Sequence, residues 1–175
     1  MELVRQLLPK AKLVAIVVNP NNPVTASDLK HLKSAATSFG LQTLILNVAT
    51  EAQLEPAFRE AARNHPDAIV VHNDAYFSTL TKQFVAAANR TAIPAIYHLR
   101  DFVTAGGLIS YGTNHPEMYR QAGVYAARML KGTKPTDLPV LFPTKFEFIV
   151  NLKTAKALNI KVPESVLIRA DEIIE

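Results

Sequence analysis

The chain contains no cysteine among its 175 residues. That absence excludes disulfides, thiolate metal ligands and cysteine nucleophiles, and it leaves both the cytoplasm and the periplasm open as locations. No apolar stretch approaches the roughly 20 residues that a membrane-spanning helix needs. The opening segment MELVRQLLPK lacks the basic region and the long apolar stretch of a signal peptide. The sequence as written therefore predicts a soluble chain that stays in the cytoplasm if it is expressed in this form.

Concentrated charge is also missing. Nineteen Lys and Arg against fifteen Asp and Glu give a net charge of +4, but the basic residues occur singly. Because nucleic-acid binding needs a basic run or patch, we expect no nucleic-acid partner. The glycine-rich loops that hold phosphates are absent too, so we expect no nucleotide cofactor, and no other cofactor is indicated.

What the sequence does contain is a regular alternation of apolar strand-like runs with amphipathic helical stretches. Strands are expected at 13–18, 41–48, 67–72, 94–97 and 106–111. Helices are expected at 2–9, from a cap at Thr25 or Ser27 to Gly40, at 51–64 and at 76–89. This alternation predicts an α/β fold with a parallel sheet.

The regular alternation of strand-like and helical stretches ends after Asn114. A helix is expected at 116–130, followed by the proline-rich stretch GTKPTDLPVLFP, a strand at 145–151 and a helix at 152–158. The three prolines of that stretch favour an extended backbone, since proline donates no hydrogen bond and fixes its own φ. We therefore expect a C-terminal helix-strand-helix appendage that needs a partner surface.

Polar side chains follow or close four of the predicted strands. In a parallel sheet the carboxyl ends of the strands share one edge, where open α/β folds bind ligands. The predicted ligand-binding residues at this edge are Asn19, Asn21, Asn73, Asp74, Tyr97, Arg100 and Tyr111. Such a set is suited to a small zwitterion, which presents an ammonium and a carboxylate.

Each of these residues also has a plainer interpretation. Asp74 is the best candidate partner for an ammonium, and it is equally suited to cap a helix beginning near Tyr76. Asn19 and Asn21 could donate to a carboxylate at the start of the next helix. Asn-Pro and Asn-Asn-Pro sequences, however, are ordinary turn formers.

The same holds for the aromatic and cationic residues. Tyr97 and Tyr111 could stack on an aromatic ligand or belong to the rim of the core. Arg100 could hold a carboxylate bidentately or form a surface ion pair with acidic neighbours such as Asp101. Gly106 and Gly107 meet a backbone requirement, either a positive φ or a close approach, and we interpret them as the hinge region.

An enzyme is the alternative interpretation of this edge. A serine, a histidine and an acid together could support nucleophilic catalysis, and the candidates are His72, Asp74, His98, Asp101 and Ser110. The segment GLISYG is one residue off the spacing of a nucleophile elbow, and it lies within a strand. No HxxxH or HExxH pattern occurs, so a metal site is not expected. A receptor lobe and a small α/β enzyme or signalling domain therefore both stand.

Four long segments together resemble a known family. They are LLPKAKLVAIVVNPNNPVTASDLK, PAIYHLRDFVTAGGLISYG, MYRQAGVYAARMLKGTKPTDLPV and TKFEFIVNLKTAKALNIKVPESVLIRADEIIE. In this order, and over nearly the whole chain, they resemble the C-terminal portion of ABC-transporter substrate-binding proteins of the tryptophan/tyrosine type. The resemblance implies one lobe of a type I periplasmic binding fold, a doubly wound sheet with the flavodoxin-like order 2-1-3-4-5, and an acidic residue of the lobe wall at the position of Asp74.

The resemblance also implies a division of the chain and a set of partners. Residues 1–112 would form the second lobe, and residues 113–175 would be the crossover helix, strand and tail that return to a first lobe, which this sequence does not contain. The implied function is solute binding for an ABC importer of amino acids or related small molecules, with a transporter permease as partner and a periplasmic or cell-envelope location.

Without that first lobe, two apolar faces would lose their cover, namely those of Met118, Val124, Tyr125 and Met129 and of Phe146, Phe148 and Val150. Exposed apolar surface costs about 25 cal/mol per Å², so another burial is favoured. We expect a homodimer that exchanges its C-terminal segments, since exchange of identical elements is a low-cost route to association. The alternative is that the tail folds back on its own lobe.

Overall fold

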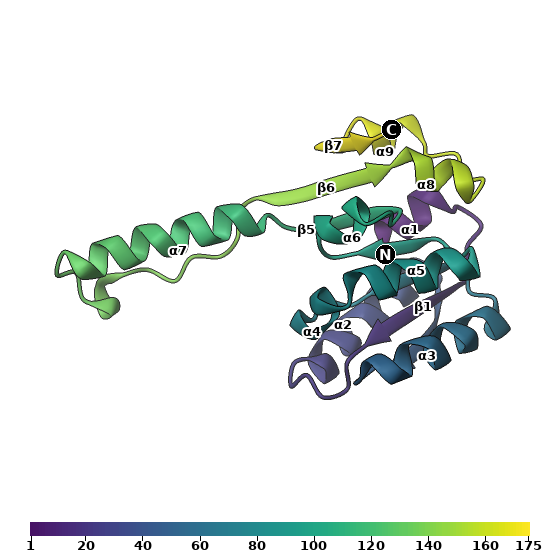
Figure 1. Cartoon of the computed structure of the whole chain (residues 1–175), viewed down its shortest axis with the longest axis horizontal. Coiled ribbons are helices and arrows are strands. Elements are labelled where there is room, and N and C mark those ends of the chain that lie inside the picture. The colour runs from purple at the N-terminus through teal and green to yellow at the C-terminus, as the bar shows by residue number, and fades with distance from the viewer.

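Seven strands form one sheet in the order β2-β1-β3-β4-β5-β6-β7 in this computed structural model, which describes residues 1–175 (Figure 1). Strands β1 to β5 pair in parallel, β6 runs antiparallel to β5, and β7 is parallel to β6. The first five strands confirm the predicted order 2-1-3-4-5. The strand bounds are β1 (Leu13–Val18), β2 (Gln42–Asn47), β3 (Ala68–Val71), β4 (Ala95–Tyr97), β5 (Ile109–Thr113), β6 (Phe146–Asn151) and β7 (Glu172–Ile174).

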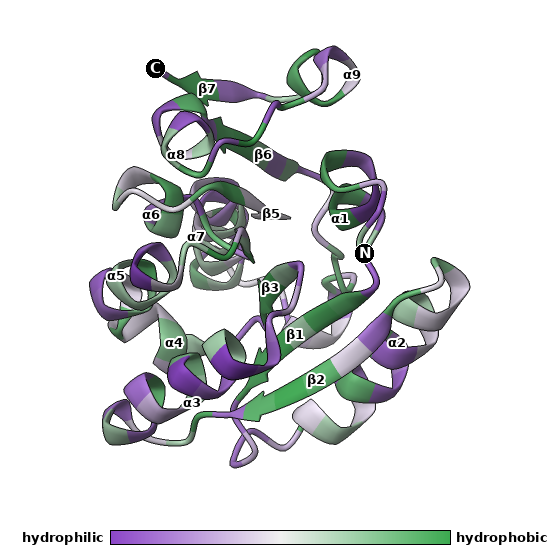
Figure 2. Ribbon diagram, turned by 90° about the vertical axis from the view of Figure 1, so that its right-hand side faces the viewer, coloured by the Kyte–Doolittle hydropathy of each residue, from purple (hydrophilic) through white to green (hydrophobic).

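Helices cover both faces of the sheet (Figure 2). Helices α3 to α6 lie over one face, where Phe58, Phe84 and Phe102 belong to the largest apolar cluster. Helices α1 and α2 cover the other face, and α8 and α9 pack beside β6. The helix bounds are α1 (Glu2–Leu7), α2 (Thr25–Ser38), α3 (Glu51–Asn64), α4 (Ala75–Thr79), α5 (Thr81–Thr91), α6 (Arg100–Thr104), α7 (His115–Leu130), η1 (Pro135–Asp137), α8 (Leu152–Ala157) and α9 (Glu164–Leu167).

Two local predictions for the helices need correction. The helix expected at 76–89 is divided into α4 and α5 at Leu80, whose backbone leaves helical geometry at φ −110° and ψ 22°. Helix α2 begins at Thr25 after Val24, with no side-chain cap, so neither Thr25 nor Ser27 caps it. The Thr25 hydroxyl instead donates to the Asn19 carbonyl at 2.6 Å and ties the loop after β1 to the helix.

An arm, residues 114–145, projects from the lobe (Figure 1). It consists of α7 and a proline-rich segment that runs back alongside it, joined by a 2.7 Å hydrogen bond from the Tyr125 hydroxyl to the Pro139 carbonyl. No residue of α7 is buried, and Leu130 and Phe142 are 90% and 82% exposed. Of the helix residues expected to lose their cover, Met118, Val124 and Met129 are exposed, whereas Tyr125 is half-buried against the proline-rich segment.

The same expectation is wrong for β6. Phe148 is 3% exposed and Val150 is fully buried, because β6 pairs with β5 and packs under α8 and α9. Only Phe146, at the arm end of β6, keeps an exposed side chain. The predicted division at residue 113 changes accordingly: residues 146–175 fold back on the lobe, and the arm alone leaves it. None of the helices combines the length and apolar character needed to cross a membrane.

Candidate ligand-binding rim

The carboxyl ends of β1, β3, β4 and β5 lie along one edge of the sheet, because these strands are parallel. We call this edge the rim and define it by Asn19–Asn22, His72–Asp74, Tyr97–His98 and Tyr111. The register places the last residues of β1 beside those of β3, with Val17 opposite Val71, and Tyr97 of β4 beside Ser110 of β5. The predicted convergence of the strand ends is thus present, while the individual residues differ in what they offer a ligand.

Asp74 links two loops of the rim. One carboxylate oxygen accepts a 2.8 Å hydrogen bond from the Tyr76 backbone N–H and caps α4. The other accepts a 2.7 Å hydrogen bond from the Asn22 side-chain amide, which comes from the loop after β1. With 4% of its surface exposed, Asp74 acts first as a helix cap and a bridge between loops. The capping alternative is confirmed, and the bridge to Asn22 was not predicted.

The asparagines after β1 form a turn. Asn19 is buried, and its side-chain oxygen accepts a 3.0 Å hydrogen bond from the Asn21 backbone N–H. The turn-forming alternative therefore holds for Asn19. Asn21 and Asn73 are exposed at the rim, where their amide groups can reach a ligand.

Tyr97 and Tyr111 differ in how far their side chains are exposed to solvent. Tyr97 is 2% exposed, and its ring stacks on Phe102 with centroids 4.7 Å apart, which favours its alternative interpretation as a residue of the core over a role in ligand stacking. Burial raises the pKa of its hydroxyl. Tyr111 is 49% exposed and stacks on Phe146 with centroids 5.8 Å apart. It is the tyrosine that remains available at the rim.

Arg100 is already paired. Its guanidinium donates to Glu147 of β6 at 2.7 Å and to Glu172 of β7 at 2.8 Å. The ion-pair alternative is confirmed, although the partners come from the C-terminal strands and not from Asp101. Because both terminal nitrogens of the guanidinium are engaged, Arg100 cannot bind a ligand carboxylate bidentately without breaking these two ion pairs.

Gly106 and Gly107 have local roles. Gly106 has a φ of +103°, and a side chain at Gly107 would come within 2.6 Å of the Tyr97 ring. Both glycines precede β5, whereas the arm leaves from the other end of that strand, after Thr113. A hinge at these glycines therefore does not fit the path of the chain, and the arm instead joins the lobe through the ends of β5 and β6.

His98 is buried at the end of β4, next to Gly112 of β5. A Cβ at Gly112 would collide with the His98 carbonyl oxygen, so only glycine allows this approach. Burial, with smaller contributions from the nearby His115 and His72, lowers the pKa of His98 to about 4, against an opposing effect of Asp74 and the Val71 backbone. His98 is therefore neutral at physiological pH.

The catalytic alternative is not assembled at the rim. Ser110 is buried, and its hydroxyl has no hydrogen-bond partner. His72 binds Asp28 of α2 at 2.9 Å, and His98 lies 3.5 Å from the hydroxyl of Ser78. Neither histidine forms a hydrogen bond with Ser110, so the arrangement lacks the base that would activate this serine.

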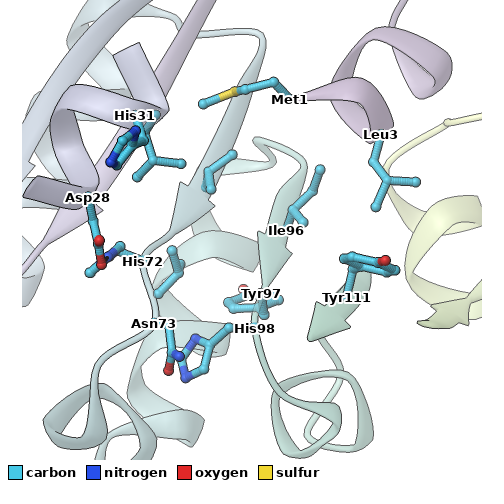
Figure 3. A pocket seen from close by; sticks show the side chains of 13 residues that line it. Met1, Leu3, Asp28, His31, His72, Asn73, Ile96, Tyr97, His98 and Tyr111 are labelled. Atoms are coloured by element: carbon cyan, nitrogen blue, oxygen red, sulfur yellow. Dashed lines mark hydrogen bonds and ion pairs between the residues drawn. The ribbon is translucent and has the colours of Figure 1, made fainter. Parts of the chain in front are cut away.

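A cavity of about 400 Å³ opens beside the rim, between α1 and α2 (Figure 3). Its walls combine rim residues with side chains of both helices and with the strands beneath. They include Leu3, Asp28, Leu32, His72, Ile96 and Tyr111. Sequence reasoning did not predict this cavity, because helix periodicity does not reveal how far apart two helices lie on a sheet. The contacts of Asn22, Asp28 and Gly112 were not predicted either, since each joins segments that are distant in the chain or strands whose register the sequence does not reveal.

Comparison with known proteins identifies the family. The family described as "ABC transporter substrate binding protein" matches residues 1–174. A "Tyrosine-binding protein" of Clostridioides difficile (strain R20291) is 25% identical over 161 residues, which are 92% of this chain and 46% of that protein.

Two solved structures share the fold. A conserved domain protein from Vibrio cholerae has a TM-score of 0.90 and 26% identity, over 98% of this chain and 58% of that one. The ABC domain of Streptococcus pneumoniae in complex with L-Trp has a TM-score of 0.90 and 25% identity, over 99% of this chain and 58% of that one. This chain thus spans about half the length of these relatives. With the family matching from residue 1 to residue 174, the chain belongs to the ABC transporter substrate-binding proteins.

Proposed function

We propose that this chain is the solute-binding part of a receptor for an ABC importer, and that it binds a free amino acid or a related small molecule without chemical change. The observation that carries the proposal is the family match over residues 1–174, together with a rim of polar groups that opens beside a cavity. One relative is named a tyrosine-binding protein, and another was solved with L-Trp. Aromatic amino acids are therefore the first ligands to test.

At the rim we assign the ligand contacts to Asn21, Asn73 and Tyr111, which are the exposed members of the predicted set. Asn19 and Asp74 hold the loops that carry Asn21 and Asn73, since their side-chain oxygens accept hydrogen bonds within the chain. The Asp74 carboxylate still adds negative potential on the side where a ligand ammonium would lie. Tyr97 borders the cavity, but its ring is stacked on Phe102, so we assign it no ligand contact. Arg100 is paired with Glu147 and Glu172 and is not assigned one either.

The exposed apolar residues of the arm need a surface to pack against. Its apolar residues are exposed, and the relatives are about twice as long as the part that this chain covers. We propose that the arm packs into a second half of the receptor, and that the ends of β5 and β6 act as the hinge. In the absence of that half, two copies would associate through their arms. A permease partner and a periplasmic or cell-envelope location complete the proposal by analogy with the family.

A thermal-shift screen of the full 175-residue chain tests this function. A ligand that binds only the native state raises the apparent stability. We expect stabilisation by L-tryptophan or L-tyrosine at millimolar concentration, with the amino acid recovered unchanged. Stabilisation by no amino acid, or conversion of the amino acid to a product, would contradict the proposal.

A further inference from the structure

Strand β2 is the outermost strand of the sheet and has a neighbour on one side only, namely β1 (Figure 2). The backbone N–H groups of Gln42 and Val48 donate to carbonyls at the two ends of β1. Such bonds alternate along a strand, so the N–H and C=O groups of Thr43, Ile45 and Asn47 point away from β1. These outward groups have no strand to pair with in the chain.

The two edges of the sheet differ in how they are protected against pairing. Proteins protect an exposed edge with short strands, charged residues, proline or β-bulges. The β7 edge has three residues, and its Glu172 pairs with Arg100. The β2 edge has six residues in an uninterrupted register with β1, and residues 34–50 include no charged residue and no proline. The β2 edge therefore lacks all four kinds of protection.

A hollow of about 490 Å³ lies beside this edge, where α2 ends and β2 begins. Lys33 and Thr37 of α2 and Thr43 of β2 are among its lining residues. Ile45 packs against the apolar cluster beneath α2, and alternation places Thr43 and Asn47 on the same face of the strand. A strand laid along β2 would thus have room for its side chains on the α2 side.

The edge is complementary to itself in an antiparallel arrangement. With Ile45 on a two-fold axis, it lies opposite Ile45 of the second copy, and Thr43 lies opposite Asn47 of the second copy. Because the backbone groups of these residues point outward, each pair can exchange both N–H···O bonds. No like charges meet across the strands, since the stretch is uncharged. The Asn47 side chain of the second copy would then lie beside the hollow that Lys33 lines.

We propose that β2 is an interface at which two copies of this chain pair edge to edge, so that their sheets join into one. The contact is isologous and closes after two copies. It lies at the opposite end of the sheet from β5 and β6, where the arm leaves, so it needs neither a ligand nor a cover on the arm. A contact confined to one strand edge is small, and we expect a Kd of about 10–100 µM.

The test uses the full chain with Leu130, Val140 and Phe142 replaced by serine, which removes exposed apolar residues of the arm. Sedimentation velocity over a range of concentrations should show a monomer–dimer equilibrium and no larger species. Thr43→Pro removes an outward N–H, leaves the bonds to β1 in place and should weaken the dimer about tenfold or more. Thr43→Lys should do the same through like charges. Thr104→Lys, at an exposed position of α6, is the matched control and should leave the dimer unchanged.

Amide hydrogen exchange measured by NMR locates the contact. The outward amides of Thr43, Ile45 and Asn47 should exchange rapidly well below the Kd. At a chain concentration of about ten times the Kd, where about a fifth of the chains remain monomeric, their exchange should slow about fivefold. The amides of Leu44 and Leu46 point toward β1 and serve as internal controls, since their exchange should not change with concentration.

The outcomes decide the inference independently of the proposed function, because no ligand is present. A dimer that both changes at Thr43 weaken, with outward amides protected only at high concentration, supports it. A chain that stays monomeric, or outward amides whose exchange ignores concentration, overturns it. Association that both Thr43 variants retain assigns the contact to another surface, and a continuous series of larger species contradicts a closed pair.

Discussion

The residues of the rim fall into two groups, those that hold it together and those that face outward. Asp74 and Asn19 are occupied by internal partners, as is Arg100 next to the rim. Tyr111 and Asn73 remain exposed. A sequence pattern locates a strand end, but it does not reveal which polar side chains there already have partners.

Acid should destabilise the lobe through His98. Its pKa is lowered from 6.5 to about 4 in the folded state, so between these values the unfolded chain binds more protons than the folded one. The free energy of unfolding should therefore fall as the pH drops from about 6.5 to 4, by at most about 3 kcal/mol. Urea unfolding at a series of pH values measures this slope.

The control for that prediction is His98→Asn, which removes the titrating group. The part of the slope due to His98 should vanish in this variant, although its stability at neutral pH can differ from the parent. An identical acid slope in the two proteins would show that His98 is not buried in its neutral form.

Gly112 should tolerate no side chain. Because a Cβ there would collide with the His98 carbonyl, Gly112→Ala must push β5 away from the end of β4 and should cost about 1–3 kcal/mol of stability. Gly123→Ala in α7 is the matched control, since a Cβ at Gly123 meets no atom within 4 Å. It should be neutral or slightly stabilising, and equal effects in chemical denaturation would refute the close approach.

The positions of Tyr97 and Tyr111 in strands could be predicted from the sequence, but the surroundings of their side chains could not. Both belong to short strands that end at the rim, and both were predicted to face a ligand. Residues 95 and 97 of β4 belong to the cluster under α3 to α6, so Tyr97 points into the core. Alternation along the strand predicts that neighbours point to opposite faces, but which face opens to a cavity depends on the spacing of the helices.

At the scale of elements, the βα alternation predicted the five parallel strands and their order, because each apolar run was flanked by helical periodicity or turn residues. The short elements α6, α9 and β7 escaped prediction, since segments of three to five residues carry no measurable period. The return of β6 to the lobe agrees with the alternative in which the tail folds back on its own lobe. The alternating apolar residues of β6 indicated that it needs a partner, but not that β5 is that partner.

Asp74 should stabilise α4 and the loop after β1 together. Asp74→Ala removes the cap and leaves the Asn22 amide without its acceptor, so we expect a loss of about 1–2 kcal/mol. Asp74→Asn retains a capping oxygen and should lose less. Thermal unfolding of the two variants and the parent measures the difference, and equal losses would show that charge, not capping, is what Asp74 contributes.

At the scale of the whole molecule, the arm is the part that needs a partner. Its α7 has no buried residue, and an isolated helix of this length is only marginally stable in water. We therefore expect the chain to self-associate at micromolar concentration. Replacing the exposed Leu130, Val140 and Phe142 by serine should shift the population toward monomer in light scattering. A strictly monomeric parent would contradict this expectation.

The proposed function requires that this chain bind an amino acid and leave it unchanged. Isothermal titration of L-tryptophan and L-tyrosine into the full chain measures this binding, with Tyr111→Ala and Tyr119→Ala run in parallel. We expect saturable binding with a Kd of about 1 mM or tighter, weakened by the change at Tyr111 and unaffected by the change at Tyr119, with the ligand recovered intact. No saturable binding of any amino acid, or the appearance of a product, would contradict it.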